Sequence, residues 1–410
     1  MFHSKCHKLL NGIELISVKK DTQIFSIHVG IKVGSLYEKD EERGISHFIE
    51  HMLFKGTSKK DNEKLNNQLE ALGGEYNAYT DHNCTVYSIT ALSEEFQNSI
   101  ELLSDMMKES IFPEEEMKKE RDVIISEIRT SRDDIEDYSF KRINEVGFKN
   151  SPLKYHTLGT EKHLNSFSRE TLLNFYHRYY VPNNCYISIV SSYEHDYVLE
   201  IINKYFNDWT SNDFTINSIF QENNTPGIFT SYKSDIEQST ILYLYTFHNL
   251  NKHQELALKI LNHKLGDSAN SILFRKLREE RGLAYDVYTS LDTTNCVKSL
   301  YLYTAVGEEK VDETIKTIDM CIEDIKKENI LFDDSTINLM KKVLKTAVAF
   351  TLEDVTDLSN YIFHQMIDGE NIFAFIDDMK KLDDVKREDI YNVGRMVLNN
   401  PTIHILKNKR

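Results

Sequence analysis

The chain has 410 residues, a length that predicts two domains. Of these residues, 40% are hydrophobic, 28% charged and 11% aromatic, a composition that predicts a globular protein rather than a disordered one. A formal net charge of −16 argues against nucleic acid as the main partner, because phosphate repels an acidic surface. The five widely spaced cysteines form no Cys-x-x-Cys pair, and neither a signal-peptide pattern nor an apolar run long enough to span a membrane occurs, so we expect a cytoplasmic protein.

Strand and helix patterns alternate through the first part of the chain. Runs of β-branched residues at 12–20 and 22–35 predict two strands. Four helices are predicted next: 43–56 has the helical period, 61–73 and 94–108 are amphipathic, and 113–133 is long and rich in charged residues. Between the second and third of these, residues 76–92 predict two further strands joined by a turn.

The two halves of the chain resemble each other. The heptapeptide TALSEEF begins at Thr90 and TAVGEEK begins at Thr304, and each lies between a strand-like run and an amphipathic helix. The matched order of strand, helix, loop and helix predicts a duplicated α+β unit. We therefore expect two homologous domains, each an antiparallel-rich sheet with helices packed on one face.

The boundary between these domains is predicted from composition. A segment rich in Asn, Ser and Thr that contains a Pro-Gly pair predicts a linker at 213–228. We expect a first domain at 1–212 and a homologous second domain at 229–410. Metal-type residues occur at the first helix of the first copy only.

The segment RGISHFIEHMLFKGT contains the pattern His47-x-x-Glu50-His51. On a helix, residues four apart share a face, so both imidazoles point toward one place, where they suit Zn²⁺. Glu50 lies near the same face but offset, which is the geometry of a general base beside a metal site.

The pattern and its surroundings resemble the pitrilysin-type zinc peptidases, or inverzincins, which include insulysin and the mitochondrial processing peptidase. The resemblance rests on VGSLYEKDEERGISHFIEHMLFKGT, GGEYNAYTDHNCTVYS, ERDVIISEI and, in the second half, LFRKLREERGLAYDVYTS. It spans nearly the whole chain, and the length of the chain fits the short members that consist of two domains.

The resemblance implies a complete zinc site with one Zn²⁺ per chain. His47, His51 and Glu127 would be the ligands, Glu127 lying 76 positions after His51 (127 − 51). Glu120, two helical turns before Glu127, would accept a hydrogen bond from a ligand imidazole. Three protein ligands leave a position for water, whose proton Glu50 would take.

The resemblance also implies how a peptide is held. Asn77 and Ala78 would pair with the backbone of the substrate as a sheet edge does. Arg278 would bind the substrate main chain, and Tyr285 would stabilise the oxyanion. Asn83 stands where relatives usually have Glu, a departure whose effect on the cleft stays open.

These expectations combine into a zinc endopeptidase that cuts short or unfolded peptides in an enclosed chamber. A narrower alternative is a specific peptidase for leader peptides or presequences, and the physiological substrate stays open. Alternatives of other classes are a non-catalytic assembly subunit and a metalloenzyme of other chemistry. In long single-chain relatives, the zinc motif and the Arg–Tyr pair lie in different halves, and this chain is as long as one half. We therefore expect a homodimer, or a heterodimer with a related chain. We expect neither nucleic acid nor a membrane as a partner.

Overall fold

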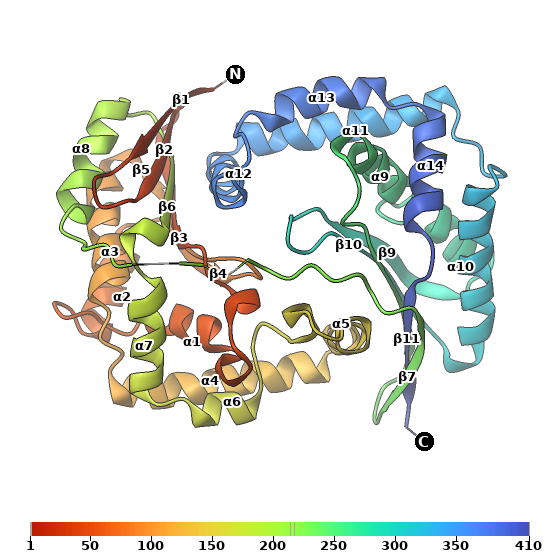
Figure 1. Cartoon of the computed structure of the whole chain (residues 1–410), viewed down its shortest axis with the longest axis horizontal. Helices are drawn as coiled ribbons and strands as arrows, with labels where there is room; N and C mark the ends of the chain where they lie inside the picture. Colours follow the sequence, from red (N-terminus) through yellow and green to blue (C-terminus); the bar gives the residue numbers. More distant parts are fainter. Residues whose placement is uncertain (1, 214, 217, 410) are drawn as a thin grey trace. The chain divides into compact units, whose positions relative to one another are not determined.

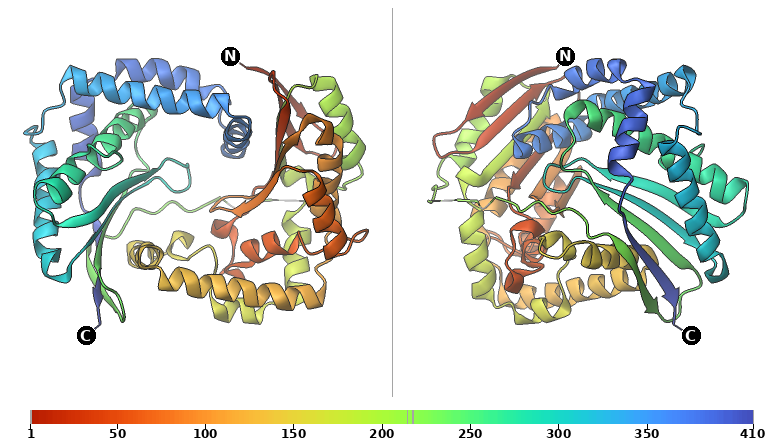
Figure 2. Two further views of the ribbon diagram at one scale, coloured as in Figure 1. Left: turned by 180° about the vertical axis from the view of Figure 1, so that it is seen from behind. Right: turned by 45° about the vertical axis from the view of Figure 1, so that its right-hand side comes forward.

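A computed structural model describes residues 2–213, 215–216 and 218–409, which form two compact units. Unit 1 is formed by the described residues of the ranges Met1–Thr130, Tyr155–Ile219 and Ala349–Ile372. Unit 2 is formed by those of the ranges Ser131–Lys154, Phe220–Val348 and Phe373–Arg410. The elements of both units can be followed in Figure 1 and, from two further directions, in Figure 2.

The compact units differ from the contiguous division expected from the sequence. The chain passes from unit 1 to unit 2 after Ile219, inside the predicted linker 213–228, of which residues 214 and 217 lie outside the described part. However, 131–154 belongs to unit 2 and 349–372 to unit 1. Each half of the sequence thus supplies one segment to the compact unit formed mainly by the other half.

Unit 1 contains a six-stranded sheet in the order β1-β2-β6-β3-β5-β4, in which only the pair β2–β6 is parallel. Its strands are β1 (His3–Lys8), β2 (Glu14–Lys19), β3 (Ile24–Ile31), β4 (Glu75–Thr80), β5 (Thr85–Leu92) and β6 (Cys185–Ser191). Its helices are α1 (Ile45–Met52), α2 (Asn62–Ala71), α3 (Phe96–Glu109), α4 (Glu114–Asp133, through Thr130), α6 (Glu161–Ser166), α7 (Arg169–Tyr179), α8 (His195–Phe206) and α12 (Val355–Asp368). Short helical turns are η1 (Ser35–Tyr37), η2 (Asp40–Glu42), η3 (Ser93–Glu95) and η5 (Pro182–Asn184).

Unit 2 contains a five-stranded sheet in the order β7-β11-β8-β10-β9, in which only β7–β11 is parallel. Its strands are β7 (Gly227–Lys233), β8 (Ser239–Thr246), β9 (Ala284–Asp292), β10 (Ser299–Val306) and β11 (Thr402–Asn408). Its helices are α5 (Ile135–Gly147), α9 (Lys252–Leu265), α10 (Val311–Lys326), α11 (Asp334–Glu353, through Val348), α13 (Ala374–Asp384) and α14 (Arg387–Val397). Short helical segments are η4 (Pro152–Lys154), the π-helix η6 (Phe274–Glu279) and η7 (Glu308–Lys310).

The two sheets share one strand order, which agrees with the internal duplication expected from the sequence. The series β2-β6-β3-β5-β4 corresponds position by position to β7-β11-β8-β10-β9, with the parallel pair in the same place. Thr90 and Thr304 lie near the ends of the corresponding strands β5 and β10, and each strand is followed by a short turn and an amphipathic helix. The α+β fold class with antiparallel-rich sheets is confirmed.

The local predictions for the first part of the chain are confirmed as well. The two expected strands are β2 and β3, the expected strand pair is β4 and β5, and the four expected helices are α1 to α4. Strand β1 was not expected, because its sequence HSKCHK carries no alternation of apolar residues. No helix in the described part of the chain is both long and apolar enough to cross a membrane.

Helix α12 adds a layer on the second face of the unit 1 sheet (Figure 2). On β5, Tyr87 faces the main core, whereas Val86 packs in a small cluster with Phe363 of α12. Phe363 is fully buried, and a Cβ added to Gly30 would lie 2.4 Å from its ring. This close approach requires glycine at position 30 and makes α12 part of the unit that carries the candidate site.

We predict that Phe363→Ala destabilises unit 1 by about 3–5 kcal/mol, because a buried ring leaves a cavity when it is removed. Phe350→Ala is the matched control, since Phe350 lies just before α12 and is 71% exposed, and its effect should stay within about 0.5 kcal/mol. Denaturant-induced unfolding of both variants measures the difference. Equal stability of the two variants would show that α12 does not pack on this sheet.

Candidate metal centre

The buried start of helix α1 is fixed by two features of the preceding loop. Gly44 adopts a φ of 90°, and a Cβ there would lie 2.6 Å from the carbonyl oxygen of Leu158, so only glycine fits. The buried carboxylate of Glu38 accepts hydrogen bonds from the backbone N–H groups of Gly44 and Ser46, both at 2.9 Å. These bonds satisfy donors that a helix start leaves without partners. Four fully buried side chains anchor the helix: Ile45, Phe48, Ile49 and Met52.

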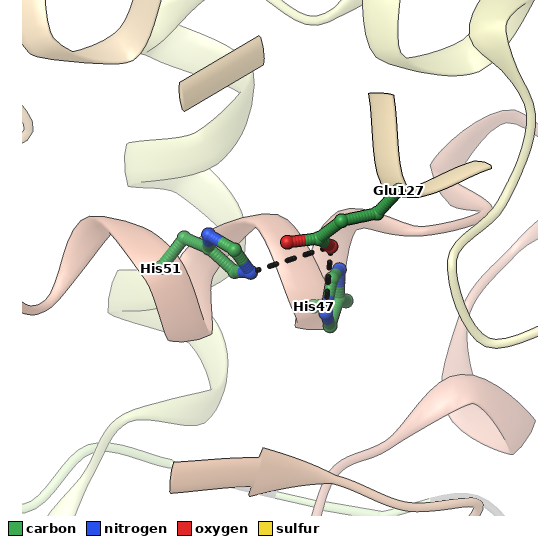
Figure 3. A group of neighbouring side chains, drawn as sticks. All are labelled: His47, His51 and Glu127. Carbon is green, nitrogen blue, oxygen red and sulfur yellow. Dashed lines mark ion pairs between the residues drawn. The ribbon is translucent and has the colours of Figure 1, made fainter. Parts of the chain in front are cut away.

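His47, His51 and Glu127 point toward one another from α1 and α4 (Figure 3). Oε2 of Glu127 lies 3.8 Å from Nε2 of His47 and 3.8 Å from Nε2 of His51. These distances are too long for hydrogen bonds. They approach the roughly 3.4 Å between tetrahedral ligands of a zinc ion held at about 2.1 Å. Within the described ranges, this is the only group of three His, Cys, Asp or Glu side chains with ligand atoms within 4.8 Å of one another.

Glu120 orients one of the two imidazoles. Its Oε2 lies 3.0 Å from Nδ1 of His51, and its Oε1 accepts a hydrogen bond from Lys55 at 2.8 Å. A carboxylate accepts, so Nδ1 of His51 carries the proton and Nε2 keeps its lone pair directed at Glu127. Burial alone would raise the pKa of Glu120, but the hydrogen bonds from His51 and Lys55 outweigh it and lower that pKa.

The charges around the two imidazoles favour a divalent cation. Burial, together with His51 and His156, lowers the pKa of His47 to about 3, so the imidazole of His47 is neutral at physiological pH. Burial disfavours a charged His51, but the hydrogen bond to Glu120 and the charges of nearby carboxylates outweigh it and raise the pKa of His51.

The carboxylates that raise the pKa of His51 also make the cluster negatively charged. The cluster contains three glutamates, Glu50, Glu120 and Glu127, and one lysine, Lys55. When all three carboxylates are ionised, the cluster has two negative charges in excess (three minus one). A divalent cation between the two imidazoles would balance this charge. The donor set, two imidazole nitrogens and a carboxylate oxygen, is one that Zn²⁺ takes in catalytic sites.

Glu50 lies beside this group and is held by a neighbouring strand. Its Oε2 accepts a hydrogen bond from Oγ1 of Thr80 at 2.5 Å, and its side chain is almost fully buried. Burial raises the pKa of Glu50 and nearby Glu127 adds to the rise, while Thr80 and His51 oppose it. A carboxylate with a raised pKa can take a proton from water and return it, which suits a general base.

Asn77 and Ala78 lie on β4, which forms one edge of the unit 1 sheet and pairs with β5. Asn77 is exposed, and its Oδ1 accepts a hydrogen bond from the N–H of Ala78 at 2.9 Å. Because β4 is an edge strand, a peptide strand could pair along its outer side. Asn83 is buried, and its Nδ2 donates to Oδ1 of Asp368 on α12 at 3.2 Å.

Arg278 and Tyr285 both belong to unit 2 and contact each other there. The guanidinium carbon of Arg278, in the π-helix η6, lies 5.0 Å from the ring centroid of Tyr285 on β9. Tyr285 is 74% exposed, so its hydroxyl can be offered to a ligand. The relation of this pair to the metal centre, which belongs to unit 1, stays a prediction.

Three residues of the site, Lys55, Thr80 and Glu38, were not expected from the sequence. Lys55 stands four residues after His51, a spacing that could have placed it beside the partner of that histidine. The contact of Thr80 with Glu50 depends on how β4 packs near α1. The contacts of Glu38 lie within the loop before α1, but no pattern in the sequence signals them.

Comparison with known proteins places these observations in a family. Residues 15–161 match the family described as "Insulinase (Peptidase family M16)", and residues 166–344 match "Peptidase M16 inactive domain". A protein named an uncharacterized zinc protease in Rickettsia felis is 30% identical over 402 residues, covering 96% of this chain and 95% of the relative. A protein of the same description in Bacillus subtilis is 28% identical over 345 residues, covering 84% of this chain and 83% of the relative.

Two further similarities concern a eukaryotic relative and a solved structure. A probable mitochondrial-processing peptidase subunit beta of Arabidopsis thaliana is 30% identical over 223 residues, covering 54% of this chain and 42% of that protein. The crystal structure of a protease from Helicobacter pylori superimposes with a TM-score of 0.93 over 99% of this chain and all of that chain, at 21% identity. The second similarity shows that the two chains share a fold.

We predict that Glu127→Gln weakens zinc binding, because a neutral amide is a poorer ligand than a carboxylate. Glu120→Gln should weaken it less, by about 10–100-fold, since it affects only the orientation of His51. Glu115→Gln, on the exposed face of the same helix, is the control and should bind zinc as the wild type does. Competition with a chromophoric chelator measures all three, and equal affinities would exclude α4 from the metal centre.

Proposed function

Because the chain belongs to peptidase family M16, the insulinase family, we propose that it is a zinc-dependent endopeptidase that hydrolyses short or unfolded peptides. The observation that carries the proposal is the convergence of His47, His51 and Glu127 with the buried carboxylate of Glu50 alongside. Names of relatives as zinc proteases support zinc as the metal. We propose one ion per chain, held by these three side chains.

Zinc, when bound, would supply a Lewis acid that lowers the pKa of water and polarises the peptide carbonyl. Glu50 would accept a proton from the water molecule as its oxygen attacks the carbonyl carbon. Glu50 would then donate that proton to the leaving nitrogen as the peptide bond breaks, which yields a carboxylate and an amine. Glu120 would keep His51 in one tautomer throughout.

The substrate backbone would be held by groups that read no particular side chain. The edge of β4 at Asn77 and Ala78 offers main-chain hydrogen bonds to an extended peptide. We propose that Arg278 binds the main chain as well and that the phenol of Tyr285 donates to the oxyanion. Only an extended chain can pair with a sheet edge, so folded proteins would be poor substrates.

A second candidate is the removal of leader peptides or presequences at specific sites. It is favoured by the similarity to a protein named as a probable subunit of the mitochondrial-processing peptidase. Cleavage of a randomised peptide library separates the two, because a general peptidase cuts most unfolded members and a specific one cuts at a defined sequence. The intact set of His47, Glu50, His51 and Glu127 argues against a non-catalytic subunit.

We predict that Glu50→Gln retains zinc but lowers peptide cleavage by about 10²–10⁴-fold, because shape and ligands stay while the base is lost. Glu63→Gln on the exposed part of α2 is the control and should keep full activity. Zinc analysis and cleavage of a quenched fluorescent peptide, with and without chelator, measure the effects. Loss of zinc from Glu50→Gln would mean that Glu50 is a ligand, and the assigned roles would then be wrong.

We further propose that the active form is a homodimer in which Arg278 and Tyr285 act on the metal centre of the second copy. Mixing Glu50→Gln with Tyr285→Phe under subunit exchange then creates one intact site in each mixed dimer. Activity should rise above that of either parent, toward about a quarter of the wild type, since half of the dimers are mixed and half of their sites are intact. No gain, with exchange shown independently by differently tagged chains, would mean that the pair acts within its own chain.

A further inference from the structure

The hydroxyl of Thr80 holds the candidate base directly. Its Oγ1 donates to Oε2 of Glu50 at 2.5 Å, which is short for a hydroxyl–carboxylate hydrogen bond and typical of the stronger, charge-assisted kind. Thr80 is the last residue of β4, and Glu50 lies in the last turn of α1. One hydrogen bond therefore joins the strand that offers a peptide edge to the helix that carries both histidines.

Strand β4 is fixed from both of its faces where this bond is made. Alternation along the strand places Ala78 and Thr80 on the side of α1, where Ala78 packs against the core. Tyr79 faces the other way, and its hydroxyl donates to Oδ1 of Asn360 at 2.7 Å and lies 2.9 Å from Nε2 of His364. Both partners belong to α12, the helix that the second half of the sequence supplies to unit 1. Packing on both faces of the strand therefore fixes the position of Thr80 relative to α1.

A buried carboxylate with a single hydroxyl partner depends on that partner for its orientation. A glutamate side chain has three rotatable bonds, and ordering them carries an entropy cost. The bond from Thr80 occupies Oε2 of Glu50 and leaves Oε1 for another partner. Without the hydroxyl, the carboxylate would lose its orientation but not its place on α1.

We propose that Thr80 is a positioning residue that holds Glu50 in the orientation from which it takes a proton from water. The proposal rests on the proposed peptidase function and extends it to a residue outside the His-x-x-Glu-His motif. Because Asn77 and Ala78 lie on the same strand as Thr80, the strand that would bind the peptide also orients Glu50, the candidate base. Tyr79, with Asn360 and His364, fixes the strand from behind.

The proposal predicts different effects on kcat for two substitutions of Thr80. Thr80→Val has nearly the same shape but no donor, so kcat should fall by about 10–100-fold while KM and zinc content stay near those of the wild type. Thr80→Ser keeps the hydroxyl, so this variant should retain most of the kcat of the wild type. Equal kcat for Thr80→Val and the wild type would overturn the proposal, and so would equal losses in Thr80→Val and Thr80→Ser, since the hydroxyl would then be irrelevant.

A second measurement does not depend on activity. Thermal unfolding of Thr80→Val, Glu50→Gln and the double variant should give shifts in Tm that do not add, because Thr80→Val removes the donor of this bond and Glu50→Gln removes the negative charge that strengthens it. Thr130→Val is the control partner for Glu50→Gln, since Thr130 is exposed and bonds only to its own helix in α4 at Ser126, and those shifts should add. Additive shifts for Thr80→Val and Glu50→Gln would contradict the proposal.

The two measurements also keep the proposals apart. If the wild type cleaved no peptide, the proposed function would fail, while the unfolding cycle would still decide whether Thr80 holds Glu50. If the wild type were active and Glu50→Gln inactive, but Thr80→Val fully active, the peptidase function would stand and the role of Thr80 would fall.

Discussion

The hydrogen bond between His51 on α1 and Glu120 on α4 is the contact on which the candidate centre depends. It joins two helices that are 62 residues apart in the sequence (114 − 52 = 62, from the end of α1 to the start of α4) and fixes the proton on Nδ1 of His51. Only in that tautomer does Nε2 face Glu127 with a free lone pair. Lys55 completes the contact from the turn after α1, so that the buried carboxylate is paired on both oxygens.

The parts of the site that the sequence predicted are those that lie on single helices. His47 and His51 share a face because they are four residues apart, and Glu120 and Glu127 do so because they are seven apart on a helix whose bounds the charge pattern predicted to within one residue. That these two helices meet was implied only by family resemblance. Thr80 could not be predicted, because its contact with Glu50 requires β4 to pass over α1, which no local pattern contains.

The same reasoning explains what the sequence could and could not predict about the fold. Alternating and helical patterns located β2 to β5 and α1 to α4, and the repeat located the corresponding strands β5 and β10. The sequence did not predict that 131–154 belongs to unit 2 and 349–372 to unit 1. Helices α5 and α12, which lie in these segments, have the periodicity of any amphipathic helix, and this periodicity does not indicate which sheet a helix packs on. The shared strand order fits a duplication in which unit 1 carries the candidate ligands His47, His51 and Glu127, while residues 166–344 match the inactive domain of the family.

Diffraction from crystals of the protein as purified, with data on both sides of the zinc absorption edge, would show directly which side chains bind zinc. We predict one anomalous peak per chain, present above the edge only, at about 2.0–2.2 Å from Nε2 of His47, Nε2 of His51 and a carboxylate oxygen of Glu127. Glu50 and Glu120 should lie outside the coordination sphere. A zinc peak at other side chains, or full-occupancy zinc bound without Glu127, would mean that the ligands assigned to the metal centre are wrong.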